Sequence, residues 1–259
     1  KRQGNLFRQV NRVYQPHYDA LITSGLYERL VKAGLLIPHQ EVEVEPADPE
    51  SAYRVISPER VEFISYPYEW SFSQLKDAAL ATLAVQKTAI EAGMVLKDAS
   101  AYNIQFRNGR PVLIDTLSFE VYKEGEPWVA YRQFCQHFLA PLALMSLVDV
   151  RLSQLLRNYI DGVPLDLAAR LLPRRTRLNL GLAMHIHLHA AAQKRYAGRA
   201  EKPQPARKMG RMEFLGFMDN LRSVVRKLTW KPAGTEWGDY YTASAGHYSE
   251  SAFEAKRQV

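Results

Sequence analysis

Residues 97–120 of this chain read KDASAYNIQFRNGRPVLIDTLSFE. The stretch holds Asp98, then Asn103 five positions later, and Asp115 at the end of an apolar run. Between the last two residues, the dipeptide Asn108–Gly109 predicts a two-residue β-hairpin, because both residue types accept a positive φ. A hairpin folds the chain back on itself, so we expect Asn103 and Asp115 to face the same spot.

These three side chains suit phosphoryl transfer. The reaction needs a carboxylate to orient the attacking hydroxyl and charge placed against the phosphate oxygens. Asp98 is the candidate catalytic base, whereas Asn103 and Asp115 offer the hard oxygen ligands that Mg²⁺ prefers. Asp and Asn are also common turn residues, so the alternative is that all three only stabilise turns.

The order of Asp98, Asn103 and Asp115 resembles the catalytic and metal-binding segments of the protein-kinase-like superfamily, especially its aminoglycoside-phosphotransferase branch. The resemblance spans roughly residues 6–150. It implies an α+β, two-lobed fold with a small sheet-rich lobe and a larger helical lobe. It also implies ATP and Mg²⁺ as cofactors, and a small-molecule or carbohydrate hydroxyl as the phosphoryl acceptor.

The same resemblance implies four residues that contact the nucleotide. Arg8 stands where the family has a phosphate-binding lysine, and Glu28 stands where a helix glutamate pairs with that lysine. Tyr66 and Tyr68 lie in the segment that corresponds to the hinge against adenine.

The chain also departs from the family pattern. It has no glycine-rich phosphate loop, and arginine replaces lysine at position 8. Leu96 stands at the usual histidine position, and the segment after the metal-binding aspartate reads Asp115-Thr116-Leu117, without glycine. These departures keep a second hypothesis open, in which the domain is a catalytically weak kinase-like module.

The C-terminal sequence resembles the lead-in to a class I S-adenosylmethionine methyltransferase domain. The matching residues are Trp237–Tyr241, His247-Tyr248 and Phe253–Val259. No G-x-G-x-G cofactor loop occurs in this chain. The resemblance therefore implies a covalently linked methyltransferase domain, with S-adenosylmethionine as that domain's cofactor.

Apolar periodicity predicts strands in the first half of the chain and helices in the second. We expect a β-rich lobe over residues 1–70, a helical lobe over 71–231 and a tail over 232–259. The predicted strands are Leu6–Val10, Glu41–Glu45, Tyr53–Ile56 and Val61–Tyr66, together with the two runs that flank the hairpin, Ile104–Phe106 and Pro111–Ile114. The predicted helices are 17–34, 71–93, 128–148, 149–160, 164–171, 177–196 and 212–229.

The cysteine count and the distribution of charge indicate where the protein functions and what it could bind. A single cysteine excludes an internal disulfide and fits a reducing compartment, so we expect a cytoplasmic protein without a membrane partner. Residues 151–231 carry 17 Lys and Arg against 5 Asp and Glu, which leaves a basic nucleic-acid-binding module as a third hypothesis. A solvated helical surface is the favoured interpretation of this charge, because no nucleic-acid motif accompanies it.

Three histidines occur at alternate positions, His185, His187 and His189. Two of them share a helix face, which is one half of a zinc site. No convincing third ligand is nearby in the sequence, so the pattern favours histidines that serve packing.

Overall fold

The computed structural model describes residues 5–189, 209–231 and 249–257. Its contacts divide the chain into a body, Lys1–Leu228, and a tail, Thr229–Val259. The body mixes helices with small sheets, which agrees with the expected α+β class at that level of detail. The tail begins three residues earlier than the expected boundary.

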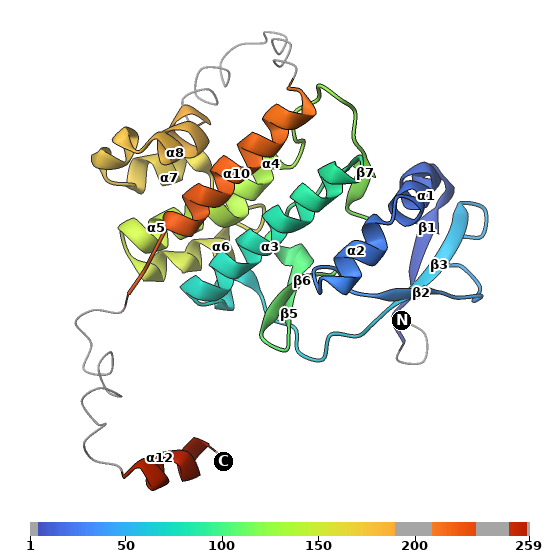
Figure 1. Ribbon diagram of the computed structural model, residues 1–259, viewed down its shortest axis with the longest axis horizontal. Coiled ribbons are helices and arrows are strands. Elements are labelled where there is room, and N and C mark those ends of the chain that lie inside the picture. Colours follow the sequence, from blue (N-terminus) through green and yellow to red (C-terminus); the bar gives the residue numbers. More distant parts are fainter. Residues whose placement is uncertain (1–4, 190–208, 232–248, 258–259) are drawn as a thin grey trace. The chain divides into compact units, whose positions relative to one another are not determined.

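The first half of the body holds a three-stranded antiparallel sheet. Its strands are β1 (Arg8–Asn11), β2 (His39–Glu41) and β3 (Ala52–Pro58), in the order β1-β3-β2 (Figure 1). Strand β1 lies close to the predicted span, whereas β2 begins earlier than predicted and ends at Glu41.

The predicted strand over Val61–Tyr66 is wrong. The chain leaves the sheet after β3, and the side chains of Phe63 and Ile64 are 78% and 50% exposed. These neighbours face opposite sides of an extended chain, so neither face is buried as a half-buried strand requires. The main chain of Ser65 instead bonds to the Gln105 side chain, which donates to its carbonyl (3.0 Å) and accepts from its N–H (3.0 Å).

The helix predicted over residues 17–34 is two helices. They are α1 (Gln15–Thr23) and α2 (Leu26–Lys32), separated at Gly25, which has a φ of 70°. Glycine adopts this left-handed conformation without a Cβ penalty, so the helix axis changes direction there. Helix α2 consequently packs against α1 and the long helix α3 (Phe72–Glu91).

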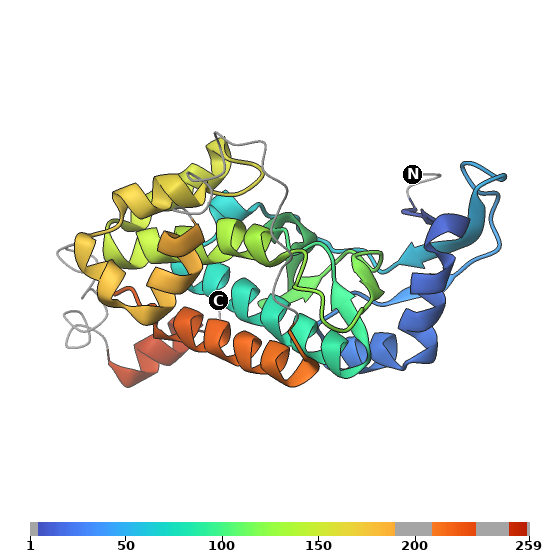
Figure 2. The ribbon, with the colours of Figure 1, turned by 90° about the horizontal axis from the view of Figure 1, so that it is seen from above.

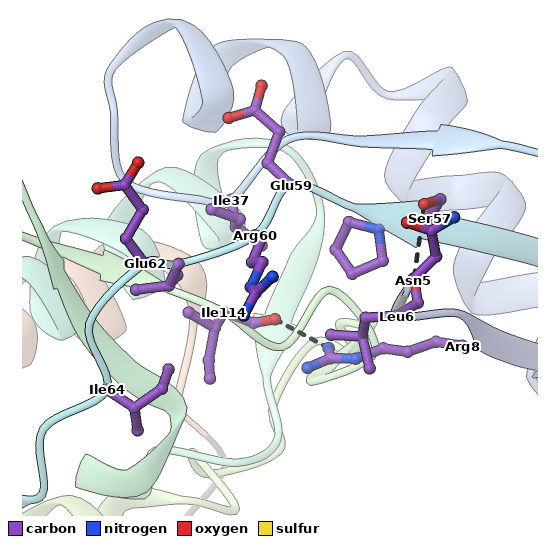
Figure 3. Close-up of a pocket in the computed structure, with 12 residues that line it drawn as sticks. Asn5, Leu6, Arg8, Ile37, Ser57, Glu59, Arg60, Glu62, Ile64 and Ile114 are labelled. Carbon is purple, nitrogen blue, oxygen red and sulfur yellow. Dashed lines mark hydrogen bonds between the residues drawn. The ribbon is translucent and has the colours of Figure 1, made fainter. Parts of the chain in front are cut away.

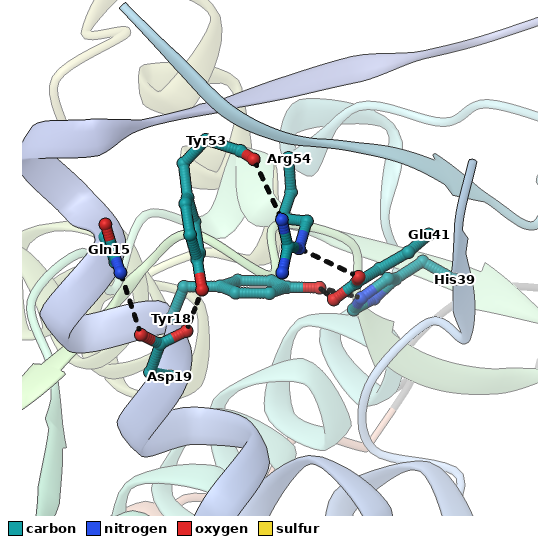
Figure 4. Close-up of polar contacts among 7 residues, drawn as sticks. All are labelled: Gln15, Tyr18, Asp19, His39, Glu41, Tyr53 and Arg54. Atoms are coloured by element: carbon teal, nitrogen blue, oxygen red, sulfur yellow. Dashed lines mark hydrogen bonds and ion pairs between the residues drawn. The ribbon is translucent and has the colours of Figure 1, made fainter. Parts of the chain in front are cut away.

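A polar network joins α1 to the sheet (Figure 4). The hydroxyl of Tyr18 donates to Glu41 (2.9 Å) and lies 3.0 Å from Nε2 of His39. Glu41 also pairs with Arg54 on β3 at 3.2 Å. Burial raises the pKa of Tyr18 and lowers that of His39, so both groups are held neutral where the helix meets the strands.

Helix α3 begins as the sequence predicts. Ser71 accepts from the N–H of Gln74 (3.3 Å), and the Gln74 side chain accepts from the N–H of Ser71 (2.9 Å). This is a capping box, which satisfies two N–H groups that the first helical turn leaves free. The helix ends just before Gly93, which has a φ of 76°.

Two short antiparallel pairs follow α3. Strand β4 (Met94–Leu96) pairs with β7 (Phe119–Val121), and β5 (Ile104–Arg107) pairs with β6 (Arg110–Leu113). The predicted hairpin at Asn108–Gly109 is confirmed, because both residues have a positive φ, 51° and 72°. The short turn η3 (Ala101–Asn103) precedes β5.

Helices fill the second half of the body (Figures 1 and 2). Helix α10 lies along α3 in both views. The predicted helical regions 128–148, 149–160, 164–171 and 212–229 are each helical in large part, and the helix predicted over 177–196 is described only as far as residue 189. The helices are α4 (Tyr131–Phe134), η4 (Cys135–Leu139), α5 (Ala140–Leu147), η5 (Val150–Gln154), α6 (Leu155–Asn158), α7 (Leu165–Leu171), η6 (Arg174–Leu178), α8 (Leu180–Leu182), η7 (Ala183–His187) and α10 (Arg211–Lys227).

The tail contains helix α12 (Glu250–Arg257), where Ser249 accepts from the N–H of Ala252 at 3.3 Å. Residues 237–248 of the methyltransferase-like stretch lie outside the described residues. Across the described ranges, no helix has the length and apolar character needed to cross a bilayer.

Candidate functional site

The segments that carry the predicted site residues lie side by side. The N–H of Lys97 donates to the carbonyl of Ser118 (2.7 Å), and the N–H of Ile114 donates to the carbonyl of Asn103 (2.8 Å). These two bonds tie the loop after β4 to the turn after β6. The loop of Asp98 and Asn103 therefore runs beside the turn of Asp115.

Asp115 is surrounded by donors. Its Oδ1 accepts from Nη1 of Arg8 (3.0 Å) and from the N–H of Leu117 (3.3 Å), and its Oδ2 accepts from the hydroxyl of Ser118. The Arg8 contact is an ion pair between side chains that are 27% and 30% exposed. Both carboxylate oxygens of Asp115 therefore accept hydrogen bonds, and Oδ1 also forms an ion pair with the guanidinium of Arg8.

Arg8 joins the three-stranded sheet to this turn. Its Nη1 also donates to the carbonyl of Ile114 at 2.8 Å. The expected pairing of Arg8 with Glu28 is wrong, because no ion pair joins them among the described residues and Glu28 is exposed. The physical reason is the break at Gly25, after which α2 packs on α1 and α3 instead of on β1.

Asn103 is half-buried beside Asp115. Its Nδ2 is buried and makes no hydrogen bond within the described residues. A buried amide without a partner is costly, so a native structure normally supplies one or holds a ligand there. The Asn103 side chain is therefore available for a ligand.

Asp98 lies in a half-buried loop that is hydrogen-bonded to Gln133 of helix α4. Its Oδ1 accepts from the N–H of Ser100 (2.9 Å), and the N–H of Ala99 donates to the side chain of Gln133 (2.7 Å). Buried His137 lies close enough to Asp98 for the carboxylate to act on its pKa. Burial is the larger effect and lowers the pKa of His137 to about 4.

A pocket of about 450 Å³ lies between the sheet and the turn that carries Ile114 (Figure 3). Apolar side chains line it together with four charged side chains, those of Arg8, Arg60, Glu59 and Glu62. The lining residues are Asn5, Leu6, Arg8, Ile37, Ser57, Pro58, Glu59, Arg60, Val61, Glu62, Ile64 and Ile114.

Tyr66 and Tyr68 are not among the residues that line this pocket. They stack on each other with ring centroids 5.6 Å apart and planes 9° apart. The preceding segment supplies seven of the lining residues, Ser57–Glu62 and Ile64, so the two tyrosines lie just beyond the part of the chain that lines the pocket.

Sequence reasoning missed several residues of the site. Ser118 holds Asp115, and its position three residues later is typical of a turn in which the aspartate side chain accepts local N–H groups. That signal was present in the sequence. No local sequence pattern predicts that Ile37 and Ile114 line the pocket, because their positions depend on how the sheet packs against the hairpin.

The histidines at 185 and 187 serve packing, as the sequence indicated. His185 is fully buried and lies between the hydroxyl of Tyr131 (2.6 Å) and Oδ1 of Asn220 (3.0 Å). His187 lies 2.8 Å from the hydroxyl of Thr176. In the part of the chain that the structure describes, no group of three His, Cys, Asp or Glu side chains is placed to hold a metal ion.

The chain is similar in sequence to a bacterial nodulation protein. The chain is 40% identical over 197 residues to the nodulation protein NoeA of Rhizobium meliloti (strain 1021). The match covers 73% of this chain and 41% of the relative, so the chain spans less than half of the relative's length. No protein-family model matches the chain.

Proposed function

We propose that residues 5–228 form a two-lobed kinase-like domain that binds ATP with Mg²⁺ and transfers a phosphoryl group to a small-molecule or carbohydrate hydroxyl. The observation that carries the proposal is the joining of Arg8, Asn103 and Asp115 beside a pocket of about 450 Å³. Arg8 lines the part-apolar pocket and pairs with Asp115, the neighbour of the lining residue Ile114, and such a site suits a ligand with a flat base and a charged phosphate chain.

The residues present fit a magnesium ion in their chemistry. Asp115 offers carboxylate oxygens and Asn103 offers the oxygen of its side-chain amide; the unpartnered Nδ2 of Asn103 is a hydrogen-bond donor and does not bear on metal binding. Oxygen donors of this kind suit Mg²⁺. When bound, the metal ion supplies positive charge against the phosphate oxygens.

Asp98 has the role of orienting the acceptor hydroxyl and taking its proton. One of its oxygens is held by the N–H of Ser100. Its other oxygen has no hydrogen bond or ion pair among the described residues, so it remains able to accept a hydroxyl proton. Support from Gln133 keeps the loop in place.

The hydrogen bonds that Asp115 already accepts favour a second candidate function. Its two oxygens are already engaged by Arg8, Leu117 and Ser118, which competes with metal binding. In this candidate the domain is a catalytically weak kinase-like module of a longer protein with an S-adenosylmethionine-dependent methyltransferase domain. The greater length of the NoeA relative is compatible with a further domain.

A melting-temperature scan tests nucleotide binding. Ligands that bind only the folded state raise its stability by mass action. We expect a shift with ATP and Mg²⁺ that is lost in Asp115→Ala and kept in Asp77→Ala, an exposed carboxylate on α3. The absence of a shift with ATP or ADP in the wild-type protein would contradict the proposal.

A transfer assay tests Asp98. We expect Asp98→Ala to bind ATP as the wild type does, and to lose phosphoryl transfer by about 10²-fold or more, because the general base is gone. Equal transfer rates in the variant and in the wild type would exclude Asp98 as the base. The second candidate predicts ATP binding without transfer in both proteins.

A further inference from the structure

The helical part of the body contains a stretch that is basic and has no acidic residue. Residues 167–189 carry four arginines and neither Asp nor Glu. Arg170 is ion-paired with a carboxylate of its own helix, α7. Arg174, Arg175 and Arg177 are exposed and form no ion pair with any described residue. Elements α8 and η7, which contact η6, lie in the same stretch and add no carboxylate, so three positive charges stay unbalanced.

The period of η6 turns these arginines outward. A 3₁₀ helix has three residues per turn, so residues i and i+3 lie on the same face. Thr176 is buried and marks the inward face of η6. One outward face therefore carries Arg174 and Arg177. The other outward face carries Arg175 and Leu178, so an exposed leucine stands beside the cations.

Hydrogen bonds hold this turn in place. The hydroxyl of Thr176 donates to the carbonyl of Pro173 (2.7 Å) and lies 2.8 Å from Nε2 of His187. At the start of α8, the side chain of Asn179 accepts from the N–H of Leu182 at 3.1 Å. The outward side chains are thus presented by a fixed backbone, which lowers the entropy that is lost on binding.

Two leucines protrude next to the arginines. Leu178 is 87% exposed and Leu180 is 84% exposed. Side chains this exposed have few neighbours along their flanks, so they stand out from the surface and do not line a groove. Two protruding leucines beside unpaired arginines suit a partner that offers both an apolar layer and anions, which is the surface of an anionic bilayer. Nucleic acid would attract the arginines but would leave both leucines in water.

We infer that residues 174–180 form a peripheral surface that binds membranes of anionic lipid. The three guanidiniums contact the lipid phosphates, and Leu178 and Leu180 insert at the boundary between headgroups and acyl chains. In Figures 1 and 2, α7 and α8 lie on the opposite side of the body from strands β1 and β3, so this surface is separate from the pocket. Such binding needs no membrane-spanning helix. The expectation of no membrane partner came from the sequence, which does not show that the two leucines are exposed.

Co-sedimentation of the full chain with lipid vesicles tests the inference. One vesicle type is pure phosphatidylcholine, and the other is an equimolar mixture of phosphatidylcholine and phosphatidylglycerol. We expect binding to the mixed vesicles and little binding to the neutral ones. Binding should weaken as salt is added, because salt screens exposed charges. A wild-type chain that does not bind the mixed vesicles would overturn the inference.

A triple variant tests the arginines. Replacing Arg174, Arg175 and Arg177 together by Gln should weaken binding to the mixed vesicles by about 100-fold, since each cation near an anionic surface contributes about fivefold. If this variant does not fold by circular dichroism, Arg175→Gln alone decides the question, with an expected loss of about fivefold. Unchanged binding in the folded variant would overturn the inference.

A second triple variant is the matched control, because it removes the same amount of charge from other parts of the body. It replaces by Gln three exposed cations, Arg12, Lys32 and Arg110. We expect this control to bind the mixed vesicles nearly as the wild type does. Equal losses in the two triple variants would overturn the inference, because net charge alone would then explain the binding.

A double variant tests the leucines and distinguishes a membrane from nucleic acid. Leu178→Asn with Leu180→Asn should weaken binding to the mixed vesicles about tenfold or more, because the apolar insertion is lost. Val13→Asn is the control, since Val13 is as exposed as Leu178 and lies in another 3₁₀ turn, η1 (Arg12–Tyr14). A double variant that binds vesicles as the wild type does, and that also binds a single-stranded oligonucleotide, would overturn the inference and assign the arginines to nucleic acid.

Discussion

At the scale of single residues, the identity of position 8 shapes the site. Arginine reaches Asp115 and the carbonyl of Ile114 with one nitrogen and keeps further donors for the pocket. A lysine carries its charge on a single nitrogen, so it lacks the planar set of separate N–H donors that a guanidinium offers.

Gly162 is a second residue whose identity the fold requires. It is buried with a φ of 92°, and a Cβ built there would lie 2.7 Å from the Cβ of Gln136 and 2.9 Å from its carbonyl carbon. The carbonyl carbon is backbone of η4 and the Cβ is bonded directly to that backbone, so neither atom can move aside cheaply. The close approach allows the N–H of Val163 to donate to the carbonyl of Gln136 at 2.9 Å.

We therefore expect Gly162→Ala to lower the free energy of unfolding by about 2–4 kcal/mol, from steric overlap together with the unfavourable φ. Urea unfolding followed by circular dichroism measures the change. Gly216→Ala is the control, because it lies exposed in α10 with nothing within 4 Å of its added Cβ. That control should gain about 0.5–1 kcal/mol from helix propensity. A Gly162→Ala protein as stable as the wild type would show that the chain relieves the overlap at little cost.

At the scale of elements, α3 organises the body. It packs on α2, on β4 and β6, and on α5, η4 and α10. Its side chain Lys76 donates to the carbonyls of Arg226 (2.8 Å) and Leu228 (2.7 Å) at the end of α10. A cation placed there satisfies carbonyls that the helix leaves free and interacts favourably with the helix dipole.

Lys76→Met keeps the length of the side chain and removes both hydrogen bonds. We expect the free energy of unfolding to fall by about 1–2 kcal/mol, because two C-terminal carbonyls lose their partner. For a chain of this size the melting temperature should fall by about 2–8 °C. Lys32→Met, at an exposed lysine without an ion pair in the described residues, is the control and should melt as the wild type does. A change confined to the control, or equal changes in both proteins, would exclude the capping role.

At the scale of the whole body, the sheet is docked onto the hairpin by main-chain bonds. The N–H of Ile37 donates to the carbonyl of Leu113 (2.9 Å), and the N–H of Leu113 donates to the carbonyl of Leu35 (2.9 Å). The buried side chain of Gln105 adds two bonds to Ser65. The pocket lies beside this junction, so its shape depends on both parts.

The buried histidines make the stability of the body depend on pH. Burial holds the pKa of His137 at about 4, and the carboxylates of Asp98 and Asp161 oppose that shift only in part. Unfolded histidine binds a proton near pH 6.5. The folded state therefore loses stability as the pH falls from about 6.5 to 4, by about 3 kcal/mol for this residue.

We expect the free energy of unfolding of His137→Gln to fall less steeply than that of the wild type between pH 6.5 and 4. Urea unfolding at several pH values measures both slopes. Between pH 7 and 8 the two slopes should coincide, which serves as the internal control. Parallel curves across the whole range would show that His137 does not bind a proton on unfolding.

The sequence by itself determined the elements whose signals are local. The capping box of Ser71 and Gln74 and the hairpin at Asn108–Gly109 depend only on near neighbours, so both were predicted correctly. The hairpin in turn brought Asn103 beside Asp115.

The tertiary structure alone decided the partners that lie far apart along the chain. Arg8 and Asp115 are 107 positions apart, and no periodicity in the sequence relates them. Their pairing, and the exclusion of Glu28, follow from the turn of the chain at Gly25 and the docking of the sheet on the hairpin. Alternation in Val61–Tyr66 predicted a strand, but a strand forms only where neighbouring strands and a covered face are supplied, and the docked sheet supplies neither there.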